Sequence, residues 1–392
     1  MNENRDMWYV VYWGRRTIDN KYKYMGKKIL CFADAPGPAE FLLPCLSHLE
    51  KAGEVKVMAF GKAEGILKTV TNLKVVTDEV SALAVYEDFL PDILVVAISS
   101  LAKGPFIERA LLGRAKADSV PVVILQDIWA NHRWPHNAET LIHSDAFCTL
   151  DEYGKKLLIE DGYPGKVFVT GNPGFDRLIA TDVSVRRAEI RKRLGIGEGE
   201  RVVFYAGQGT PREFLEDKTA FKILCDALRL LPAVRLIAKP HPRAEVTDYY
   251  TEYSSNLNFI EIKENYMSED ILPAADVVIS IFATNLVHAC YLKIPAVSIL
   301  VGKEKSPTLA GLRLSNFPPN KSGASVGFYD SDPGELSLLM EKILSGKAFR
   351  DQITENQARH FKLDGKSVER VGEVIETILH QSNIQITTFS HS

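Results

Sequence analysis

Short apolar runs alternate with amphipathic stretches along most of this chain. The first apolar run, KILCFAD, occupies residues 28–34, and the first amphipathic stretch follows at residues 41–53. The alternation continues to residue 171, pauses, and resumes at residue 201. Continuous apolar runs predict strands that are buried on both faces, and strands separated by helices predict βαβ units with a parallel sheet. The pattern therefore places the chain in the α/β class, with a doubly wound sheet in each half.

The same pattern predicts the individual elements. The predicted strands are residues 28–34, 55–60, 73–77, 93–99, 121–127, 145–151, 166–171, 201–207, 234–240, 256–262, 276–282 and 295–300. The predicted helices are residues 41–53, 62–70, 80–89, 104–117, 152–162, 185–195, 218–231, 267–275, 284–293, 335–346, 350–362 and 367–381. Residues 35–40 are predicted to be a turn, and residues 303–327, which are rich in Gly, Pro, Ser and Asn, a long loop.

The domain organisation follows from one interruption of the pattern. Residues 170–184 combine Gly, Asn, Pro and polar residues, which is typical of a hinge. A chain of 392 residues is also long for a single hydrophobic core. We therefore expect two Rossmann-like domains that face each other across a cleft. The expected segments are an unstructured extension or non-native start at 1–24, domains at 25–172 and 173–350, C-terminal helices at 351–382 and a frayed tail at 383–392.

Composition narrows the class of protein. The formal net charge of −3 disfavours a nucleic-acid-binding protein that works through a broad basic field. The five cysteines stand singly, without a C-x-x-C pair, so we expect them to be reduced and buried, as in a cytoplasmic protein. No run approaches the ~18 consecutive apolar residues of a membrane span. Contact with the inner face of a membrane, through the aromatic and basic residues near the start of the chain, stays open as an alternative.

Ligands of open parallel sheets bind beyond the carboxyl ends of the strands, so the residues there are the candidates for chemistry. After the first strand come Asp34, Gly37 and Glu40. Gly37 permits close approach of the backbone, and the helix that follows can hold a polar ligand at its N-terminus. The segment does not match G-x-G-x-x-G, which disfavours a dinucleotide cofactor. An ordinary turn between strand and helix is the alternative interpretation.

A second candidate segment follows the strand at residues 121–127. Its candidate residues are Asp127, Trp129, Asn131, His132 and Arg133. Tryptophan faces suit stacking against a sugar or a base, and Asp127 and His132 are expected to exchange protons. A helical metal pair of His132 and His136 is disfavoured, because Pro135 lies between them. The alternative is a structural corner.

Three segments of the second half carry phosphate-binding chemistry. The first is Gly207, Gln208, Gly209 and Thr210, whose glycines open the backbone amides and whose hydroxyl reaches a phosphate. The second is Lys239, His241 and Arg243, which two prolines hold stiffly at a strand end, as a phosphate grip or an acid–base site. The third is the strand-to-helix turn with Ser280, Phe282, Ala283, Thr284 and Asn285, where helix capping alone is the alternative.

Three of these segments carry a resemblance to a known superfamily. K-P-H-P-R at 239–243, followed by A-D-V-V-I-S-I-F-A-T-N-L-V-H-A at 275–289, resembles the GT-B superfamily and, within it, the CDP-glycerol glycerophosphotransferases and related glycosyltransferases. T-G-N-P-G-F-D-R-L at 170–178 resembles an interdomain segment of the UDP-N-acetylglucosamine 2-epimerases. The chain departs from both groups: residues 281–284 replace Asp-Tyr-Ser-Ser, and neither the epimerases' H-x-E-A-G segment nor their S-G-G loop has a counterpart.

The resemblance implies an N-terminal acceptor domain and a C-terminal nucleotide-donor domain. It implies that Lys239 and His241 contact the diphosphate or catalyse, that Ser280, Thr284 and Asn285 cradle the phosphates, and that the chain is an enzyme of cell-envelope glycan synthesis. Gly37, Trp129, Asn131 and Arg133 are expected to bind the acceptor, and Asp34, Glu40, Asp127, His132 and His241 are the catalytic candidates.

The leading hypothesis is a metal-independent glycosyltransferase. Its donor is a nucleotide-sugar, which acts as co-substrate in place of any cofactor, and its acceptor is an unidentified glycan or lipid-linked molecule. No nucleic-acid partner is expected. The alternatives are a UDP-sugar epimerase or hydrolase, a CDP-alditol phosphotransferase, and a non-catalytic nucleotide-binding scaffold, which the missing acid in the phosphate loop motivates.

Overall fold

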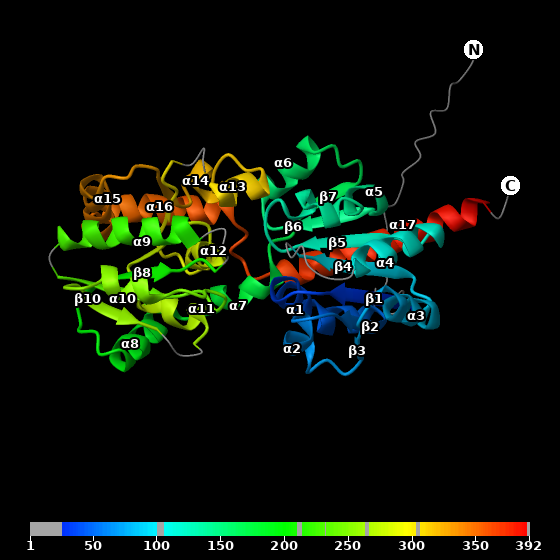
Figure 1. Cartoon of the computed structure of the whole chain (residues 1–392). Coiled ribbons are helices and arrows are strands. Elements are labelled where there is room, and N and C mark those ends of the chain that lie inside the picture. The colour runs from blue at the N-terminus through cyan, green and yellow to red at the C-terminus, as the bar shows by residue number, and fades with distance from the viewer. Residues whose placement is uncertain are drawn as a thin grey trace, which may run out of the picture.

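The chain folds around two separate parallel β-sheets (Figure 1). The computed structural model describes residues 26–99, 106–209, 214–231, 233–262, 266–302 and 306–389, with backbone alone at Thr308 and residues 382–389. We call the part built on the first sheet the N-terminal half and the part built on the second sheet the C-terminal half. The extension predicted at residues 1–24 lies outside the described residues.

The N-terminal sheet has seven strands in the order β3-β2-β1-β4-β5-β6-β7, all parallel. Its strands are β1 (Lys28–Ala33), β2 (Glu54–Ala59), β3 (Leu73–Val75), β4 (Ile93–Ile98), β5 (Val122–Gln126), β6 (Ala146–Thr149) and β7 (Lys166–Val169). Its helices are α1 (Pro36–Ala52), α2 (Ala63–Leu67), α3 (Glu79–Phe89), α4 (Ile107–Ala117), α5 (Thr140–His143) and α6 (Glu152–Glu160), with 3₁₀ turns η2 (Asn131–Arg133) and η3 (Pro135–Asn137). All seven predicted strands of this half are therefore confirmed.

The C-terminal sheet has six parallel strands in the order β10-β9-β8-β11-β12-β13. Its strands are β8 (Arg201–Ala206), β9 (Val234–Lys239), β10 (Asn258–Glu261), β11 (Val277–Ser280), β12 (Ala296–Ile299) and β13 (Val326–Phe328). The remaining helices are α7 (Asp176–Ile179), α8 (Val183–Arg193), α9 (Phe214–Arg229), α10 (Asp248–Tyr253), α11 (Ser268–Ile271), α12 (Thr284–Tyr291), α13 (Pro307–Leu312), α14 (Pro318–Ser322), α15 (Pro333–Ser345), α16 (Lys347–His360) and α17 (Ser367–Phe389), with 3₁₀ turns η4 (Pro173–Phe175) and η5 (Leu272–Ala274). Two such sheets confirm the predicted fold class.

Two predictions of irregular structure are wrong. The turn predicted at residues 35–40 is the first part of α1, which begins at Pro36 because proline is already set for the first helical turn and needs no amide donor there. The loop predicted at residues 303–327 contains α13, α14 and most of β13, which pairs with β12 through Val297 and Val326. Pro307 and Pro318 start the two helices, so residues that signalled a loop act here as helix starts.

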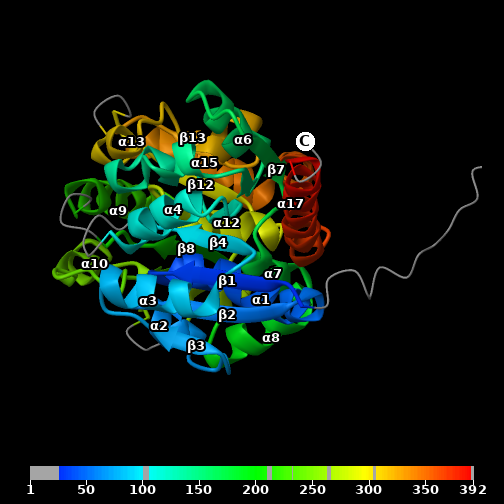
Figure 2. The same ribbon diagram turned by 90° about the vertical axis from the view of Figure 1, so that its right-hand side faces the viewer.

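The last helix returns to the N-terminal half. Val371, Val374, Ile375 and Ile378 of α17 belong to the N-terminal core, and the helix contacts α1 and β6. Figure 2, in which the N-terminal half faces the viewer, shows α17 along the flank of that half. Helix α16, in contrast, packs in the C-terminal core through Ile353. The helix continues to Phe389, beyond residue 382, where the sequence predicted a frayed tail.

Candidate active site

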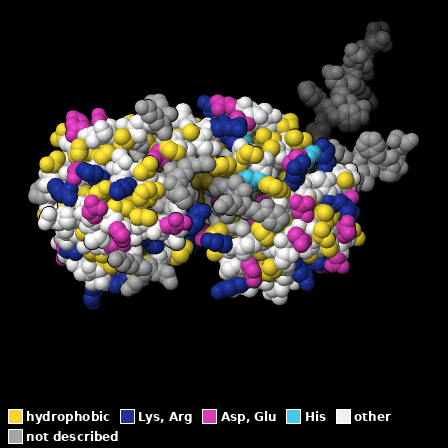
Figure 3. Space-filling view, viewed as in Figure 1, with side chains coloured by type: hydrophobic (Ala, Val, Ile, Leu, Met, Phe, Trp, Pro, Cys, Tyr) yellow, Lys and Arg dark blue, Asp and Glu magenta, His cyan; other side chains and the backbone are white. Residues whose placement is uncertain are grey.

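The order of the strands turns between β1 and β4 in the first sheet and between β8 and β11 in the second. Open parallel sheets bind ligands in the crevice at such a point, beyond the carboxyl ends of the strands. We call these places the N-terminal crevice, at Asp34, Ser99 and Asp127, which follow β1, β4 and β5, and the C-terminal crevice, at residues 207–209, 240–243 and 281–283, which follow β8, β9 and β11. Figure 3 shows the surface hollowed where the two halves meet, with Lys and Arg side chains at its edge.

Asp127 follows β5 in the N-terminal crevice and lies against the start of α1. A Cβ added to Gly37 would collide with Asp127 Oδ2, so the carboxylate lies directly against the first turn of α1. Asn131 Nδ2 donates to Asp127 Oδ1 at 2.5 Å. Burial raises the pKa of Asp127 to about 7, and the charge of Asp34 adds to this rise. A pKa near neutral pH is the property that a general base needs. Gly37 and Asn131 both lie here, as predicted, but they contact Asp127.

Asp34 forms a carboxyl pair with Glu108, a residue that sequence reasoning missed. Ser99 Oγ donates to Asp34 Oδ2 at 3.0 Å. Glu108 lies on α4 and is 6% exposed. Burial raises the pKa of Asp34, and burial together with the charge of Asp34 raises that of Glu108 to about 8. The available signal was a lone acid on the buried face of an amphipathic helix, in register with Leu111, Leu112 and Ala115.

Glu40 lies apart from these carboxyl groups, on the side of α1 that meets the hinge. Its carbonyl oxygen would lie 2.7 Å from a Cβ added to Gly174, so the hinge passes close to the helix. Burial raises the pKa of Glu40, the charge of Glu269 raises it further, and Arg177 opposes both. Arg177 also pairs with Glu269 of the C-terminal half. The structure therefore places Glu40 in a charge cluster that joins the two halves.

His132, the second proton-exchange candidate of this segment, contacts Gln126 and Asp161. Its imidazole is buried, and its Nδ1 lies 2.8 Å from Gln126 Nε2. Its Nε2 lies 2.7 Å from Asp161 Oδ2. Burial lowers the pKa of His132, and Asp161 opposes this shift. Both ring nitrogens are thus engaged within the fold, and the catalytic role expected of His132 stays a prediction.

Trp129 and Arg133 connect the two halves and do not present free faces to an acceptor. Trp129 is 1% exposed, donates through Nε1 to both Asp151 oxygens, and packs edge-on against Phe317, with ring centroids 5.6 Å apart. Arg133 pairs with Asp161 and donates from Nη1 to the carbonyl of Arg313 at 2.7 Å. The stacking role expected for Trp129 is therefore wrong. The segment with two tryptophans around Asn-His-Arg thus contributes to the interface between the two halves.

In the C-terminal crevice, His241 lies against the glycine loop after β8. Cβ atoms added to Gly207 and Gly209 would collide with Tyr250 Oη and His241 Nδ1, respectively, so the glycines let these side chains approach. The backbone N–H of Arg243 donates to His241 Nδ1 at 3.1 Å. Since Nδ1 accepts this bond, the neutral ring carries its proton on Nε2. Thr210 lies outside the described residues.

Positive charge surrounds His241. Its pKa is lowered to about 4, first by burial and then by the charges of Arg243, Lys239 and Lys62. Burial lowers the pKa of Lys239 as well. Lys62 precedes α2 in the N-terminal half, so its effect on His241 acts across the cleft. No carboxylate among the described residues pairs with Lys62, Lys239 or Arg243, and cations that lack such a partner suit a diphosphate.

Asp217, another residue that sequence reasoning missed, holds the glycine loop in place through hydrogen bonds. It is completely buried at the start of α9 and accepts hydrogen bonds from Tyr249 Oη, from Tyr250 Oη at 2.6 Å and from Tyr205 Oη at 2.7 Å. Its fourth donor is the backbone N–H of Gln208, at 3.0 Å. Burial raises the pKa of Asp217, while all four donors oppose the shift. The cluster therefore fixes the glycine loop on which His241 rests.

The turn from β11 into α12 only partly matches its predicted role. Ser280 is completely buried, donates to the carbonyl of Ala206 at 2.6 Å and accepts from Gln208 Nε2, so its hydroxyl supports the glycine loop. Phe282 packs edge-on against Phe317. Ala283 is the N-cap of α12 and gives no side-chain cap, and Thr284 and Asn285 form the first turn. Helix capping, the alternative interpretation of this turn, is therefore not what Thr284 and Asn285 do, and no side chain caps the first turn of α12.

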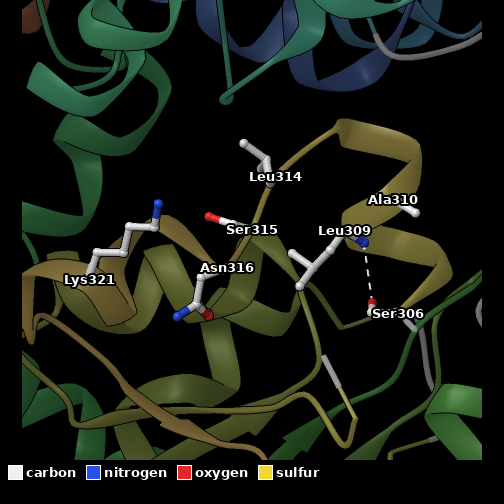
Figure 4. A pocket seen from close by; sticks show the side chains of 7 residues that line it. All are labelled: Ser306, Leu309, Ala310, Leu314, Ser315, Asn316 and Lys321. Carbon is white, nitrogen blue, oxygen red and sulfur yellow. Dashed lines mark hydrogen bonds between the residues drawn. The ribbon is translucent and has the colours of Figure 1, made fainter. Parts of the chain in front are cut away.

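Two cavities accompany the crevices. One of about 200 Å³ adjoins the glycine loop and is lined by Gln208, Gly209, Phe214, Arg243, Ala244, Glu245, Val246 and Tyr249. A second, of about 440 Å³, is lined by Ser306, Leu309, Ala310, Leu314, Ser315, Asn316 and Lys321 (Figure 4). Lys321 donates to Tyr153 Oη of α6 at 3.2 Å, so this cavity lies where α13 and α14 meet the N-terminal half. Among the described residues, no cluster of three His, Cys, Asp or Glu side chains is arranged to hold a metal ion, all five cysteines are free and buried, and no helix could span a membrane.

Comparisons with known proteins show the fold. No family model and no curated protein matches the sequence. A co-structure of S. aureus MnaA with UDP superposes with a TM-score of 0.68 at 15% identity, covering 90% of this chain and 97% of the other. UDP-GlcNAc 2-epimerase from Neisseria meningitidis, bound to UDP-GlcNAc, superposes with a TM-score of 0.64 at 15% identity, covering 89% of this chain and 100% of the other. A glycosyltransferase from Rickettsia africae superposes with a TM-score of 0.60 at 12% identity, covering 90% of this chain and 99% of the other. At these identities the likeness shows that the chain has the GT-B fold, with two Rossmann-like halves.

Proposed function

We propose that this chain is a glycosyltransferase that takes a sugar from a nucleotide-sugar bound in the C-terminal crevice and passes it to an acceptor on the N-terminal half. One observation carries the proposal: neutral His241 lies among Lys239, Arg243 and Lys62, and no carboxylate among the described residues pairs with Lys239 or Arg243. Such a place favours a dianionic ligand, because charge-assisted hydrogen bonds to phosphate need uncompensated cations. Solved structures of the same fold hold UDP or UDP-GlcNAc.

Different residues of the C-terminal crevice bind different parts of the nucleotide-sugar donor. The cavity of about 200 Å³ beside Gly209 and Tyr249 takes the nucleoside. Lys239 and Arg243 take the diphosphate, His241 Nε2–H donates to it, and the uncapped amides at the start of α12 add the favourable end of the helix dipole. These groups neutralise the leaving diphosphate themselves, which is the metal-independent design expected from the sequence.

The N-terminal crevice supplies the base. As the acceptor oxygen bonds to the anomeric carbon, the bond from that carbon to the diphosphate oxygen breaks and the electron pair leaves with the nucleoside diphosphate. The acceptor hydroxyl loses its proton to Asp127, whose pKa of about 7 suits this role near neutral pH. Asn131 holds the carboxylate through Oδ1, which leaves Oδ2 against α1 and the crevice.

A second candidate is an epimerase or hydrolase that acts on the nucleotide-sugar without an acceptor. The observation that favours it is the set of carboxyl groups with raised pKa values in one crevice: Asp34, Glu108 and Asp127. Breaking and remaking a bond at one sugar needs both a proton donor and a proton acceptor, and this crevice holds candidates for each. Consumption of the donor offered alone supports this second activity, whereas consumption only with an added acceptor supports transfer.

The first experiment is a thermal-shift panel of UDP, CDP, GDP, dTDP and their sugar conjugates on the wild type and on His241→Ala. A ligand at about 100 times its Kd stabilises the folded protein by about 2.7 kcal/mol, which is visible as a raised Tm. We expect one nucleotide to raise the Tm of the wild type but not that of the variant, measured against each protein without ligand. A preference for CDP favours alditol phosphate transfer over sugar transfer. No shift with any nucleotide would contradict the proposal.

A further inference from the structure

Two buried carboxyl oxygens of the N-terminal crevice face no hydrogen-bond donor among the described residues. Asp34 Oδ1 and Glu108 Oε1 are both inaccessible to solvent, and no donor in the described part of the chain pairs with either. Their two carboxyl groups are nevertheless within hydrogen-bonding reach of each other. Ionised carboxylates only accept hydrogen bonds, so a bond between these groups requires that one of them keeps its proton.

The surroundings show where this proton resides. Glu108 is 6% exposed and lies on the apolar face of α4, beside Leu111 and Leu112. Asp34 is half-buried and already accepts from Ser99 Oγ through Oδ2. The titratable groups that act on Asp34 are Glu108 and His136, and Asp127 is a further acid beside it. No Lys or Arg among the described residues pairs with either member, so none of those residues compensates a second negative charge here.

We propose that Glu108 is protonated at neutral pH and donates its proton in a hydrogen bond to Asp34, which thereby stays an ionised carboxylate fixed at the mouth of the N-terminal crevice. Glu108 is thus a positioning residue that acts through Asp34. The pair carries one negative charge instead of two. The consequence for catalysis rests on the proposed function: Asp34 accepts hydrogen bonds from the sugar or acceptor hydroxyls beside Asp127, and loss of the shared proton above neutral pH adds a charge and ends this arrangement.

The protonation state is tested without any substrate. A carboxyl group whose folded pKa is raised stabilises the fold below its unfolded pKa of about 4.3, and this stability is lost as pH rises through the folded value. With the value near 8 for Glu108, the loss falls mostly between about pH 5 and pH 8. We expect Glu108→Gln, which keeps the shape and a donor but cannot ionise, to lose less Tm over this range than the wild type.

Glu64→Gln is the matched control. It removes the same charge from an exposed position on α2 of the same half, and should follow the wild type. An equal loss of Tm in the wild type and Glu108→Gln would overturn the proposal. Infrared difference spectra add a second readout: the carbonyl band of a protonated carboxylic acid that disappears in Glu108→Gln but persists in Glu64→Gln supports the shared proton, and its persistence in Glu108→Gln contradicts it.

The positioning role is tested by rescue and by a pH profile once a donor is known. Glu108→Leu removes the donor to Asp34 and should lower kcat at least about tenfold, whereas Glu108→Gln, whose amide donates to the same oxygen, should recover most of that loss. The wild-type rate should fall above about pH 8, and Glu108→Gln should lack this fall. Equal rates in the Leu and Gln variants would contradict the role. Absence of turnover by the wild type would refute the proposed function alone, because the Tm and infrared results decide the shared proton independently.

Discussion

The two crevices arise from the same topology but hold opposite chemistry. Each lies where the order of parallel strands turns, at β1 and β4 in one half and at β8 and β11 in the other. The N-terminal crevice gathers acids whose pKa values rise through burial, and the C-terminal crevice gathers cations around a neutral histidine. The topology of the sheet therefore fixes where each crevice lies, whereas the residues of the loops determine its charge.

The buried acids of the two halves differ in a second way. Asp217, in the C-terminal half, accepts from three tyrosines and a backbone amide, so every part of its charge is met by a fixed donor. Asp34 and Glu108, in the N-terminal half, each keep an oxygen that no donor among the residues described here reaches. A satisfied buried acid holds a fold together, whereas an under-satisfied acid at a crevice is poised to exchange a proton.

Replacing Asp127 should separate chemistry from binding. In Asp127→Asn we expect kcat to fall about 10²–10⁴-fold, because a general base contributes about this much, while the Kd of the nucleotide stays within about twofold. The wild-type rate should rise as pH passes about 7, since the base must be ionised, and the variant should lack this rise. Steady-state kinetics and calorimetric titration measure the two quantities. A nucleotide Kd that worsens as much as the rate would break the division of labour between the crevices.

Replacing Asp217 should cost stability. In Asp217→Asn the new amide N–H₂ faces tyrosine hydroxyls that had an acceptor, so we expect a loss of about 1–3 kcal/mol in the free energy of unfolding. Asp226→Asn is the matched control on the same helix, where a partly exposed acid pairs with Lys222 and Arg229, and it should cost about 0–1 kcal/mol. Chemical denaturation measures both. Equal losses would mean that the tyrosine cluster contributes no more than a surface ion pair.

Much of the fold could be predicted from the sequence because local patterns of apolar and polar residues indicate most of its strands and helices. Buried parallel strands are continuous apolar runs, and all seven of the first half could be recognised as such. Strand β13 could not, because Val326–Phe328 is only three residues long, contains a glycine and follows two prolines that resemble loop signals. The return of α17 to the N-terminal half could not be predicted either, since its apolar face fits a core in either half and only the tertiary fold chooses between them.

The candidate site divides along the same line. Lys239, His241 and Arg243 could be found because two prolines, a strand end and three basic side chains coincide within five residues. Glu108 and Asp217 could not be placed, since the partners that define them lie on other elements: Asp34 for the first, Tyr249 and Tyr250 for the second. Trp129 was misread because a buried aromatic at an interface and an exposed aromatic at a sugar site have the same sequence signature.

Removing one cation from the C-terminal crevice should weaken binding moderately. In Lys239→Met we expect the Kd of the nucleotide to rise about tenfold, which corresponds to about 1.4 kcal/mol for one charged contact. Lys68→Met, at an exposed position after α2, is the control for loss of a positive charge and should leave Kd unchanged. Raising the salt concentration should reduce the difference between wild type and Lys239→Met, because screening weakens the same contact. A Kd insensitive to Lys239 would move the diphosphate away from this crevice.

The smallest effect concerns pH, and it distinguishes a neutral from a charged histidine. The pKa of His241 is lowered to about 4, so the ring binds its proton only below the range in which an ordinary histidine titrates. Between about pH 6 and pH 8 His241 therefore keeps one charge state, and the Kd for a nucleotide-sugar, whose diphosphate does not titrate there, should change less than about twofold. A Kd that improves several-fold on going from pH 8 to pH 6 would show that His241 binds as a cation. The C-terminal crevice would then hold its ligand by a switchable charge, and acid–base chemistry would no longer be confined to the N-terminal half.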